Sequence, residues 1–346
     1  MEDEQEILDV LARFPRSDIH LDPRYLRLFQ DFTGQTAVYF YYQGEGGEFL
    51  QAFFERPLPP VEGGGEKDLL SPWYYGGPVH TFEDDKAAQE EYSAFLSELD
   101  AYAKENGIVS QFQRLNPALG NDAVYKDDPN LIWNRKVVSI DLMRNLDDIR
   151  AQYDYKVRKN LRRAQKEGLR VVRGATPEAV EAFVRVYAAS MDRKQAGTFY
   201  YFSEKFYADL FSSFPNEAQL FVVYAGDEVA AASLVLGNGV ILHDYLRAAY
   251  PQFAAMRPND FVVDAIVEWA KEARYAQYSL GGGHSTHEDD SLLAFKRSFS
   301  PVTRDFYVYK KVHNREAYAV RCAAGDKQPQ DLEFEQADFF PEYKTQ

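Results

Sequence analysis

Residues 275–299 read YAQYSLGGGHSTHEDDSLLAFKRSF, a strand-favouring run, three glycines and an amphipathic run in succession. The first six residues predict a strand, which ends at Gly281, Gly282 and Gly283. Because glycine has no Cβ, these residues allow a tight exit and a close approach of main chain to a ligand. The last ten residues predict a helix whose apolar residues recur at helical spacing and leave Lys296 beside the apolar face.

The residues on either side of this stretch predict a series of strands and helices in a defined order. Strands are expected at 219–224, 229–236, 240–249 and 304–311, and a helix at 260–273. Two antiparallel strands followed by strand, helix, strand, helix and strand resemble one lobe of the GNAT acyltransferases. The fold class that we predict is therefore α+β.

In such a lobe two neighbouring parallel strands separate and an acyl donor lies in the gap. Here these strands are 241–245 and 275–280. The loop before the intervening helix, residues 255–260, lacks the glycines that usually cradle the pyrophosphate of coenzyme A. We expect Arg257 of this loop and Tyr245 at the end of the first strand to bind substrate, together with the three glycines.

The length of 346 residues favours two domains. Strand-favouring runs at 36–43 and 48–57 flank a glycine-rich turn, which predicts a hairpin, and apolar residues at helical spacing predict a helix over 85–106. This similarity to the second half predicts two tandem GNAT-like lobes with mixed sheets and a cleft between them. We place the lobes at residues 1–145 and 146–346.

Composition limits the protein's location and partners. The single cysteine, Cys322, excludes an internal disulfide, and a reducing compartment fits. The acidic start of the chain, MEDEQEILDV, lacks the positive charge of a signal peptide, and no apolar run is long enough to span a bilayer. We therefore expect a cytoplasmic protein without membrane insertion. A formal net charge of −15 argues against broad nucleic-acid binding.

One segment departs from this acidity. Residues 147–168 predict a long helix whose second half is strongly basic, and Lys159, Arg162 and Arg163 lie at its centre. One reading is a solvated helix face whose charges balance acidic neighbours. The other is a docking surface for an anionic substrate or an RNA end.

Several motifs, taken in order, resemble the FemABX family of peptidoglycan-bridge aminoacyltransferases and their GNAT-like relatives. They cover most of the chain, although each is weak alone. The motifs are residues 71–78 (SPWYYGGP), 113–117 (QRLNP), 158–168 (RKNLRRAQKEG), 187–193, 280–283 (LGGG) and 295–299 (FKRSF).

The resemblance implies transfer of an activated acyl group to an amine of a cell-wall precursor. Aminoacyl-tRNA is the family's donor, so no bound cofactor is implied. The family's Phe-Lys pair corresponds to Phe295 and Lys296, with the lysine contacting the donor and stabilising the reacting carbonyl. A family arginine that binds acceptor phosphate corresponds to Arg193. Asn116 stands where some members carry an acidic residue, which weakens the case for a carboxylate base there.

Other residues have both a chemical and a structural reading. His243 and Asp244 are candidates for taking a proton from the attacking amine, but a hydrogen-bonded core histidine is the alternative. Tyr200 belongs to an aromatic run that either stacks on substrate or packs. Lys296 is alternatively a surface lysine. His284 and His287 with nearby aspartates form too weak a pattern for a metal site, so we expect none.

The sequence leaves three functions open. The first is a FemABX-like N-acyltransferase that uses the acceptor end of a charged tRNA and a peptidoglycan precursor or another amine. The second is a GNAT acyltransferase that transfers an acetyl or other acyl group from acyl-CoA to a polysaccharide or small amine. The third is a non-catalytic protein that keeps the cleft to bind a peptide or nucleotide-sugar. Neither the acyl group nor the oligomeric state follows from the sequence.

Overall fold

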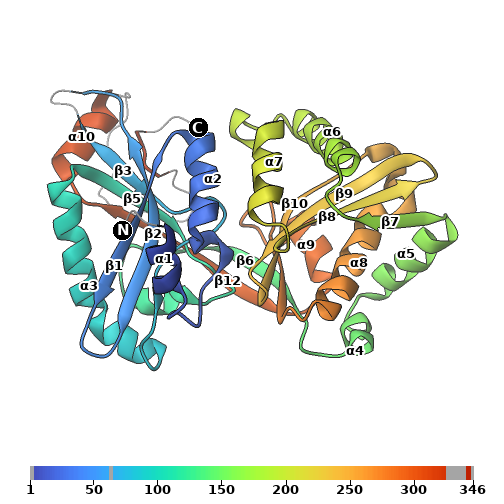
Figure 1. Ribbon diagram of the computed structural model, residues 1–346, viewed down its shortest axis with the longest axis horizontal. Coiled ribbons are helices and arrows are strands. Elements are labelled where there is room, and N and C mark those ends of the chain that lie inside the picture. The colour runs from blue at the N-terminus through green and yellow to red at the C-terminus, as the bar shows by residue number, and fades with distance from the viewer. Residues whose placement is uncertain (1–3, 62–64, 325–339, 344–346) are drawn as a thin grey trace. The chain divides into compact units, whose positions relative to one another are not determined.

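The computed structural model describes residues 4–61, 65–324 and 340–343, and Figure 1 shows their helices and strands in chain order. Helices pack on sheets that contain both parallel and antiparallel pairs, which confirms the expected α+β class. Among the helices described, none is both long enough and apolar enough to cross a membrane.

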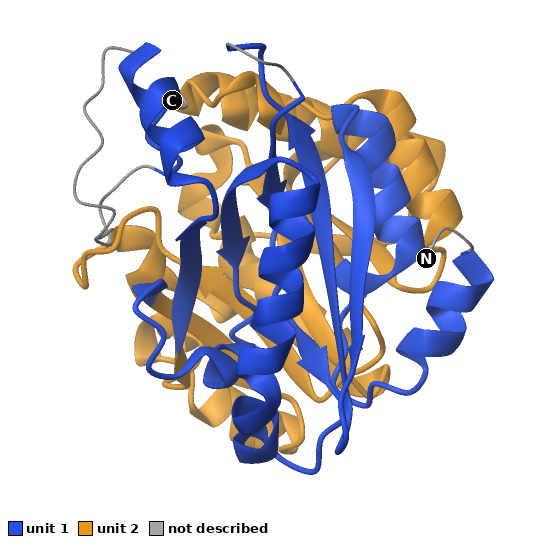
Figure 2. Cartoon of the chain, turned by 90° about the vertical axis from the view of Figure 1, so that its left-hand side faces the viewer, with its two compact units in different colours: residues 1–135, 305–346 blue, residues 136–304 orange. Residues whose placement is uncertain are grey.

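The chain forms two compact units, coloured separately in Figure 2. Unit 1 comprises residues 1–135 and 305–346, and unit 2 comprises residues 136–304. The chain passes between them within β6 (Leu131–Asp141) and again within β12 (Thr303–Val312). This division differs from the expected boundary at residue 145, because the end of the chain returns to the first unit.

Unit 1 contains a sheet with the strand order β1-β2-β3-β5-β12, and β4 pairs with β2. The expected hairpin is present as β1 and β2, and the expected helix as α3. The return of β12 follows from its antiparallel pairing with β5. The other elements of this unit are α1 (Glu4–Leu11), α2 (Pro23–Thr33), β1 (Thr36–Gln43), β2 (Glu48–Pro57), β3 (Lys67–Leu70), β4 (Val79–His80), α3 (Asp85–Glu105), β5 (Ile108–Arg114) and α10 (Arg315–Ala324).

Unit 2 contains a sheet with the strand order β6-β11-β10-β9-β8-β7, in which only β10 and β11 form a parallel pair. The expected strand and helix order is confirmed. Besides β6, its elements are α4 (Leu146–Ala151), α5 (Tyr155–Lys166), β7 (Leu169–Arg173), α6 (Pro177–Lys194), α7 (Glu204–Ser213), β8 (Ala218–Ala225), β9 (Glu228–Gly237), β10 (Ile241–Ala249), α8 (Pro258–Glu272), β11 (Gln277–Gly282) and α9 (Ser291–Arg297).

The core of unit 2 lies between its sheet and the helices α5 and α8. The buried residues that α8 contributes are Val262, Val263, Ile266, Val267 and Ala270. Val157 and Ala164 of α5 join the same cluster, which explains why the basic helix stays attached by its apolar face. Helix α6 contacts β8, β9 and β10 but adds no residue to this cluster, and it covers the other face of the sheet (Figure 1).

The single helix that we predicted over residues 147–168 is wrong, because the chain forms two helices, α4 and α5. Between them Asp154 has extended backbone angles, and its N–H donates to the carbonyl oxygen of Ser298 at 2.8 Å. The buried ring of Tyr153 packs edge-on against Phe299. These tertiary contacts stabilise the break, which helical spacing alone does not reveal.

Candidate functional site

The parallel strands β10 and β11 separate part-way along their length. Pairing stops at His243 and Ser279, although β10 continues to Ala249 and β11 to Gly282. Beyond this point the strands no longer satisfy each other's main-chain groups, so those groups are available to a ligand or to nearby side chains. The expected separation is confirmed.

A β-bulge reorients β10 in the same region. The register with β9 skips Tyr245, which lies between Asp244 and Leu246. In a regular strand, residues three apart point to opposite faces. The extra residue places Asp244 and Arg247 on one face, where Nη2 of Arg247 lies 3.0 Å from Oδ2 of Asp244.

Asp244 and His243 are adjacent residues of β10, and the side chains of both are almost entirely buried. The hydroxyls of Ser233 and Tyr278 each donate to Oδ1 of Asp244 at 3.2 Å, in addition to the ion pair with Arg247. A carboxylate that accepts from three side chains is poorly placed to take a proton from an amine. His243 is fully buried. A catalytic role for either residue stays a prediction, and the structure favours the packing alternative.

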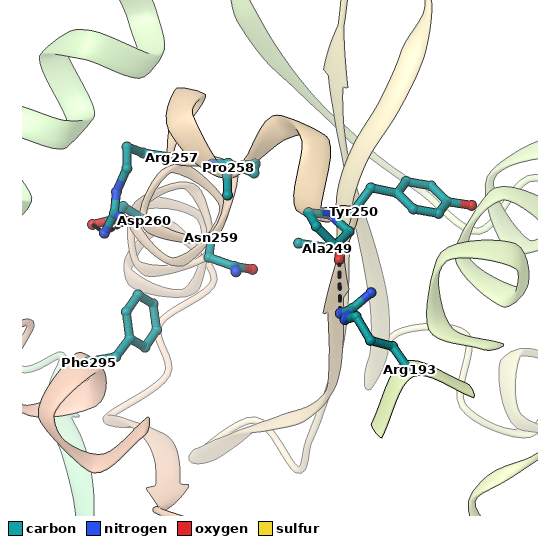
Figure 3. A pocket seen from close by; sticks show the side chains of 10 residues that line it. Arg193, Ala249, Tyr250, Arg257, Pro258, Asn259, Asp260 and Phe295 are labelled. Atoms are coloured by element: carbon teal, nitrogen blue, oxygen red, sulfur yellow. Dashed lines mark hydrogen bonds and ion pairs between the residues drawn. The ribbon is translucent and has the colours of Figure 1, made fainter. Parts of the chain in front are cut away.

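A cavity of about 390 Å³ lies at the N-terminus of α8 (Figure 3). Its lining comes from the end of α6, the residues that follow β10, the start of α8 and helix α9. Arg193, Arg257 and Phe295, which the sequence predicted to bind substrate, line it together. Tyr250 and Asn259 add polar groups to the same wall.

The start of α8 presents main-chain donors to this cavity. Arg257 adopts the left-handed conformation with φ of 66°, Pro258 is the first helical residue, and no side chain caps the helix. The first turn of a helix has N–H groups without intrahelical partners and a partial positive charge, which suits an anion. Arg257 is paired with the buried Asp260, Nη2 to Oδ2 being 3.0 Å, and Asn160 donates to the same carboxylate.

Cations also gather on the opposite wall. Nη2 of Arg193 donates to Oγ of Ser190 at 3.2 Å, and Figure 3 shows its contact with the carbonyl oxygen of Ala249. Burial lowers the pKa of the neighbouring Lys194, and the charges of Arg193 and Arg247 lower it further. Arg193 thus adds a second guanidinium group to the cavity that Arg257 also lines.

The glycine segment holds the start of α9. Gly281 has φ of 73°, and a Cβ on Gly283 would lie 2.4 Å from Oδ1 of Asp290. Asp290 caps α9 by accepting from the N–H groups of Leu292 and Leu293, both at 2.9 Å. These bonds, with those from Ser285, hold the pKa of Asp290 well below its usual range. The aspartate that we considered as a metal ligand therefore serves as a helix cap.

Lys296 is buried rather than on the surface, with 8% of the residue exposed. Its Nζ donates to the carbonyl oxygen of Gly282 at 2.7 Å, which ties the end of α9 to the end of β11. A lysine ammonium has three N–H donors, so this bond orients the side chain without using all of them.

Residues 151–297 match a protein family described as an acetyltransferase (GNAT) domain. They form a GNAT acyltransferase domain. The match falls within unit 2 and includes the separated strands, the cavity and the glycine segment. The protein is an acyltransferase. A search among curated proteins found no match.

Solved structures extend the likeness to the whole chain. FemX has a TM-score of 0.66 at 15% identity, over 92% of this chain and 98% of that one. The C-terminal domain of a putative lysylphosphatidylglycerol synthetase from Agrobacterium fabrum has a TM-score of 0.55 at 14% identity, over 91% of this chain and 93% of that one. L-PGS from Bacillus licheniformis has a TM-score of 0.51 at 16% identity, over 86% of this chain and 93% of that one. The tandem GNAT-like fold and the resemblance to FemX are thus confirmed at the level of fold.

Several residues that the sequence singled out do not line the cavity: Tyr200, His243, Asp244, Tyr245, Gly281, Gly282, Gly283 and Lys296. Tyr200 is 44% exposed in a short 3-10 turn, and it is not among the described residues that line the cavity. In unit 1 the N–H of Asn116 donates to Oδ1 of Asn121 at 2.8 Å, and its own Oδ1 accepts from the N–H of Ala118 at 3.0 Å. Asn116 therefore shapes a turn, and a role for Tyr200 in binding stays a prediction.

Sequence reasoning missed Arg247 and Lys194 in the GNAT domain. Lys194 follows Arg193, so the adjacent basic pair was a usable signal. Arg247 was hidden because strand alternation places it on the face opposite Asp244. Only the bulge at Tyr245 brings it to the site.

Proposed function

We propose that this acyltransferase moves an aminoacyl group from an aminoacyl-tRNA to an amine of a peptidoglycan precursor. The observation that carries the choice of donor is helix α5. It has six basic residues and no acidic one, in a chain whose formal net charge is −15. These residues are Lys156, Arg158, Lys159, Arg162, Arg163 and Lys166.

The surroundings of α5 favour the interpretation as a docking surface and not the interpretation as a helix face whose charges are balanced by acidic neighbours. All six basic residues are exposed, and only Arg163 has an ion-pair partner within the described residues, Glu167 at 3.7 Å. The neighbouring strand β7 adds Arg170 and Arg173, whose guanidinium groups lie over aromatic rings. Such a surface attracts a phosphate backbone by replacing its counterions.

The chemistry that we propose is aminolysis of an ester. The acceptor amine attacks the ester carbonyl, a C–N bond forms, and the C–O bond to the tRNA ribose breaks. The amine's proton passes to the departing ribose oxygen. Lys296 and nearby main-chain N–H groups stabilise the oxyanion of the tetrahedral intermediate. Arg193 and Lys194 hold the phosphate of an anionic acceptor, and no bound cofactor takes part in this scheme.

Mass spectrometry of reaction products tests the donor directly. Purified protein is incubated with charged tRNA, and separately with acyl-CoA, in the presence of candidate cell-wall amines. We expect an aminoacylated amine only from charged tRNA. Lys159→Glu with Arg162→Glu should weaken tRNA binding at least tenfold, since two phosphate contacts become repulsive.

A matched control changes the same charge elsewhere in unit 2. Arg185→Glu with Lys205→Glu alters two exposed residues on α6 and α7 that pair with residues of their own helices. This variant should bind tRNA like the wild type. Equal affinities for both double variants and the wild type would contradict the docking role of α5.

One observation favours acyl-CoA as an alternative donor. The uncapped start of α8 opens on the cavity beside Arg257, and such an end binds pyrophosphate in spite of the missing glycines. Calorimetry with coenzyme A decides this alternative. Heat of binding that disappears in Arg257→Gln would support it, and no heat at millimolar ligand would remove it.

A further inference from the structure

Arg247 is a buried cation that the proposed chemistry leaves without a role. Its side chain is 11% exposed, and Nη2 pairs with Asp244 at 3.0 Å. Nη1 is buried and makes no hydrogen bond within the described residues. A buried N–H without an acceptor destabilises a fold unless something compensates.

The ring of Phe295 provides a favourable contact for the buried guanidinium group of Arg247. The guanidinium carbon of Arg247 lies 5.0 Å from the centroid of the Phe295 ring, a cation–π distance. Phe295 lines the cavity at the start of α8 and immediately precedes Lys296 on α9. Arg247 therefore joins the carboxylate of Asp244 on β10 to a ring that forms part of the cavity wall.

Helix α9 depends on such contacts, because it has only seven residues. A helix of this length is not stable by itself, so its position is set by what its side chains touch. Asp290 fixes the first turn, and the bond from Lys296 to Gly282 fixes the last. The stacking of Phe295 on Arg247 adds a lateral contact next to the lysine.

We infer that Arg247 is a positioning residue for acyl transfer: it holds the ring of Phe295, and thereby the orientation of Lys296 towards the reacting carbonyl. In this arrangement Asp244 fixes the guanidinium group. This inference rests on the proposed transfer reaction for its effect on turnover, but the geometric part can be measured without any substrate.

The first test measures the reactivity of Lys296 by labelling with sulfo-N-hydroxysuccinimide acetate and peptide mass spectrometry. Arg247→Met keeps the length of the side chain and removes its charge, and we expect labelling of Lys296 to rise at least threefold. Arg247→Lys, which keeps the charge, should stay near the wild type. Arg150→Met breaks another Arg–Asp pair in unit 2, with Asp264 at 2.8 Å, and controls for general destabilisation. Equal labelling in Arg247→Met and Arg150→Met would overturn the inference.

The second test separates positioning from mere packing by kinetics. Arg247→Met should lower kcat roughly three- to thirtyfold, the range that a cation–π contact spans, and leave KM of the acceptor nearly unchanged. In a Phe295→Leu background the same substitution should have little further effect, because the ring through which Arg247 acts is gone. Additive losses would refute the inference. A changed Lys296 reactivity with no transfer from any donor would instead refute the proposed function and leave the positioning role standing.

Discussion

Gly283→Ala tests the geometry that holds α9 in place. The new methyl group would lie 2.4 Å from Oδ1 and 2.6 Å from Cγ of Asp290, distances too short for a methyl carbon and a non-bonded atom. Because the backbone angles of Gly283 are not in the left-handed region, strain of the main chain does not contribute. The destabilisation that we expect therefore comes from displacement of the Asp290 carboxylate.

The magnitude follows from the bonds that the displaced carboxylate loses. Asp290 accepts from the N–H groups of Leu292, Leu293 and Ser285, each at 2.9 Å. Loss of a helix cap costs about 0.5–2 kcal/mol. For a unit of this size, each kcal/mol lowers the melting temperature by about 2–4 °C. We therefore expect Gly283→Ala to lower the melting temperature by roughly 1–8 °C and to reduce transfer activity, since α9 carries Lys296.

A double-mutant cycle read by thermal unfolding separates the clash from other effects. In an Asp290→Ala background the two atoms that come closest to the new methyl group, Oδ1 and Cγ, are absent, so Gly283→Ala should cost less than about 0.5 kcal/mol. Gly197→Ala is the control glycine, because nothing lies within 4 Å of its added Cβ. The reasoning is refuted if Gly283→Ala costs as much without the Asp290 side chain as with it.

Three further predictions concern charge. The pKa of Asp290 is lower in the folded state than in the unfolded state, where it is near 4, so the charged carboxylate stabilises the fold above about pH 4. This contribution is lost as the pH falls. In urea titrations the stability advantage of the wild type over Asp290→Asn should therefore shrink between about pH 5 and 3. Arg193→Gln should raise the pKa of Lys194, seen as slower acetylation of that lysine at pH 8, and unchanged reactivity would contradict the proposed repulsion. Replacing both Lys159 and Arg162 with glutamine should reduce the salt dependence of tRNA binding by about two ions, and an unchanged slope of log affinity against log salt would count against contact with phosphate.

The order of elements in unit 2 was predictable because local patterns specify it. Residues 219–224 and 229–236 are strand-favouring runs on either side of a turn at 225–228, which predicts a hairpin. The glycines after Leu280 likewise end a strand by their own backbone preference. Phe295, Arg193 and Arg257 were predicted from motifs, and they meet at one cavity. These three residues lie in or next to short sequence patterns, so the sequence near each of them was enough to single it out.

Long-range contacts were not predictable in the same way. The break at Asp154 depends on the carbonyl oxygen of Ser298, 144 positions further along the chain. The return of β12 to the first unit depends on its pairing with β5. Neither contact leaves a trace in the spacing of nearby apolar residues, from which the helices and strands were predicted.

The sequence by itself determined the strand, glycine turn and helix of residues 275–299, because backbone preference and helical spacing are local properties. Tertiary structure decided what the site is made of. A bulge at Tyr245 moves Arg247 to the face of Asp244, and the ring of Phe295 covers it. One extra residue in a strand reverses which side every later side chain faces, and only the pairing with the neighbouring strand reveals that residue.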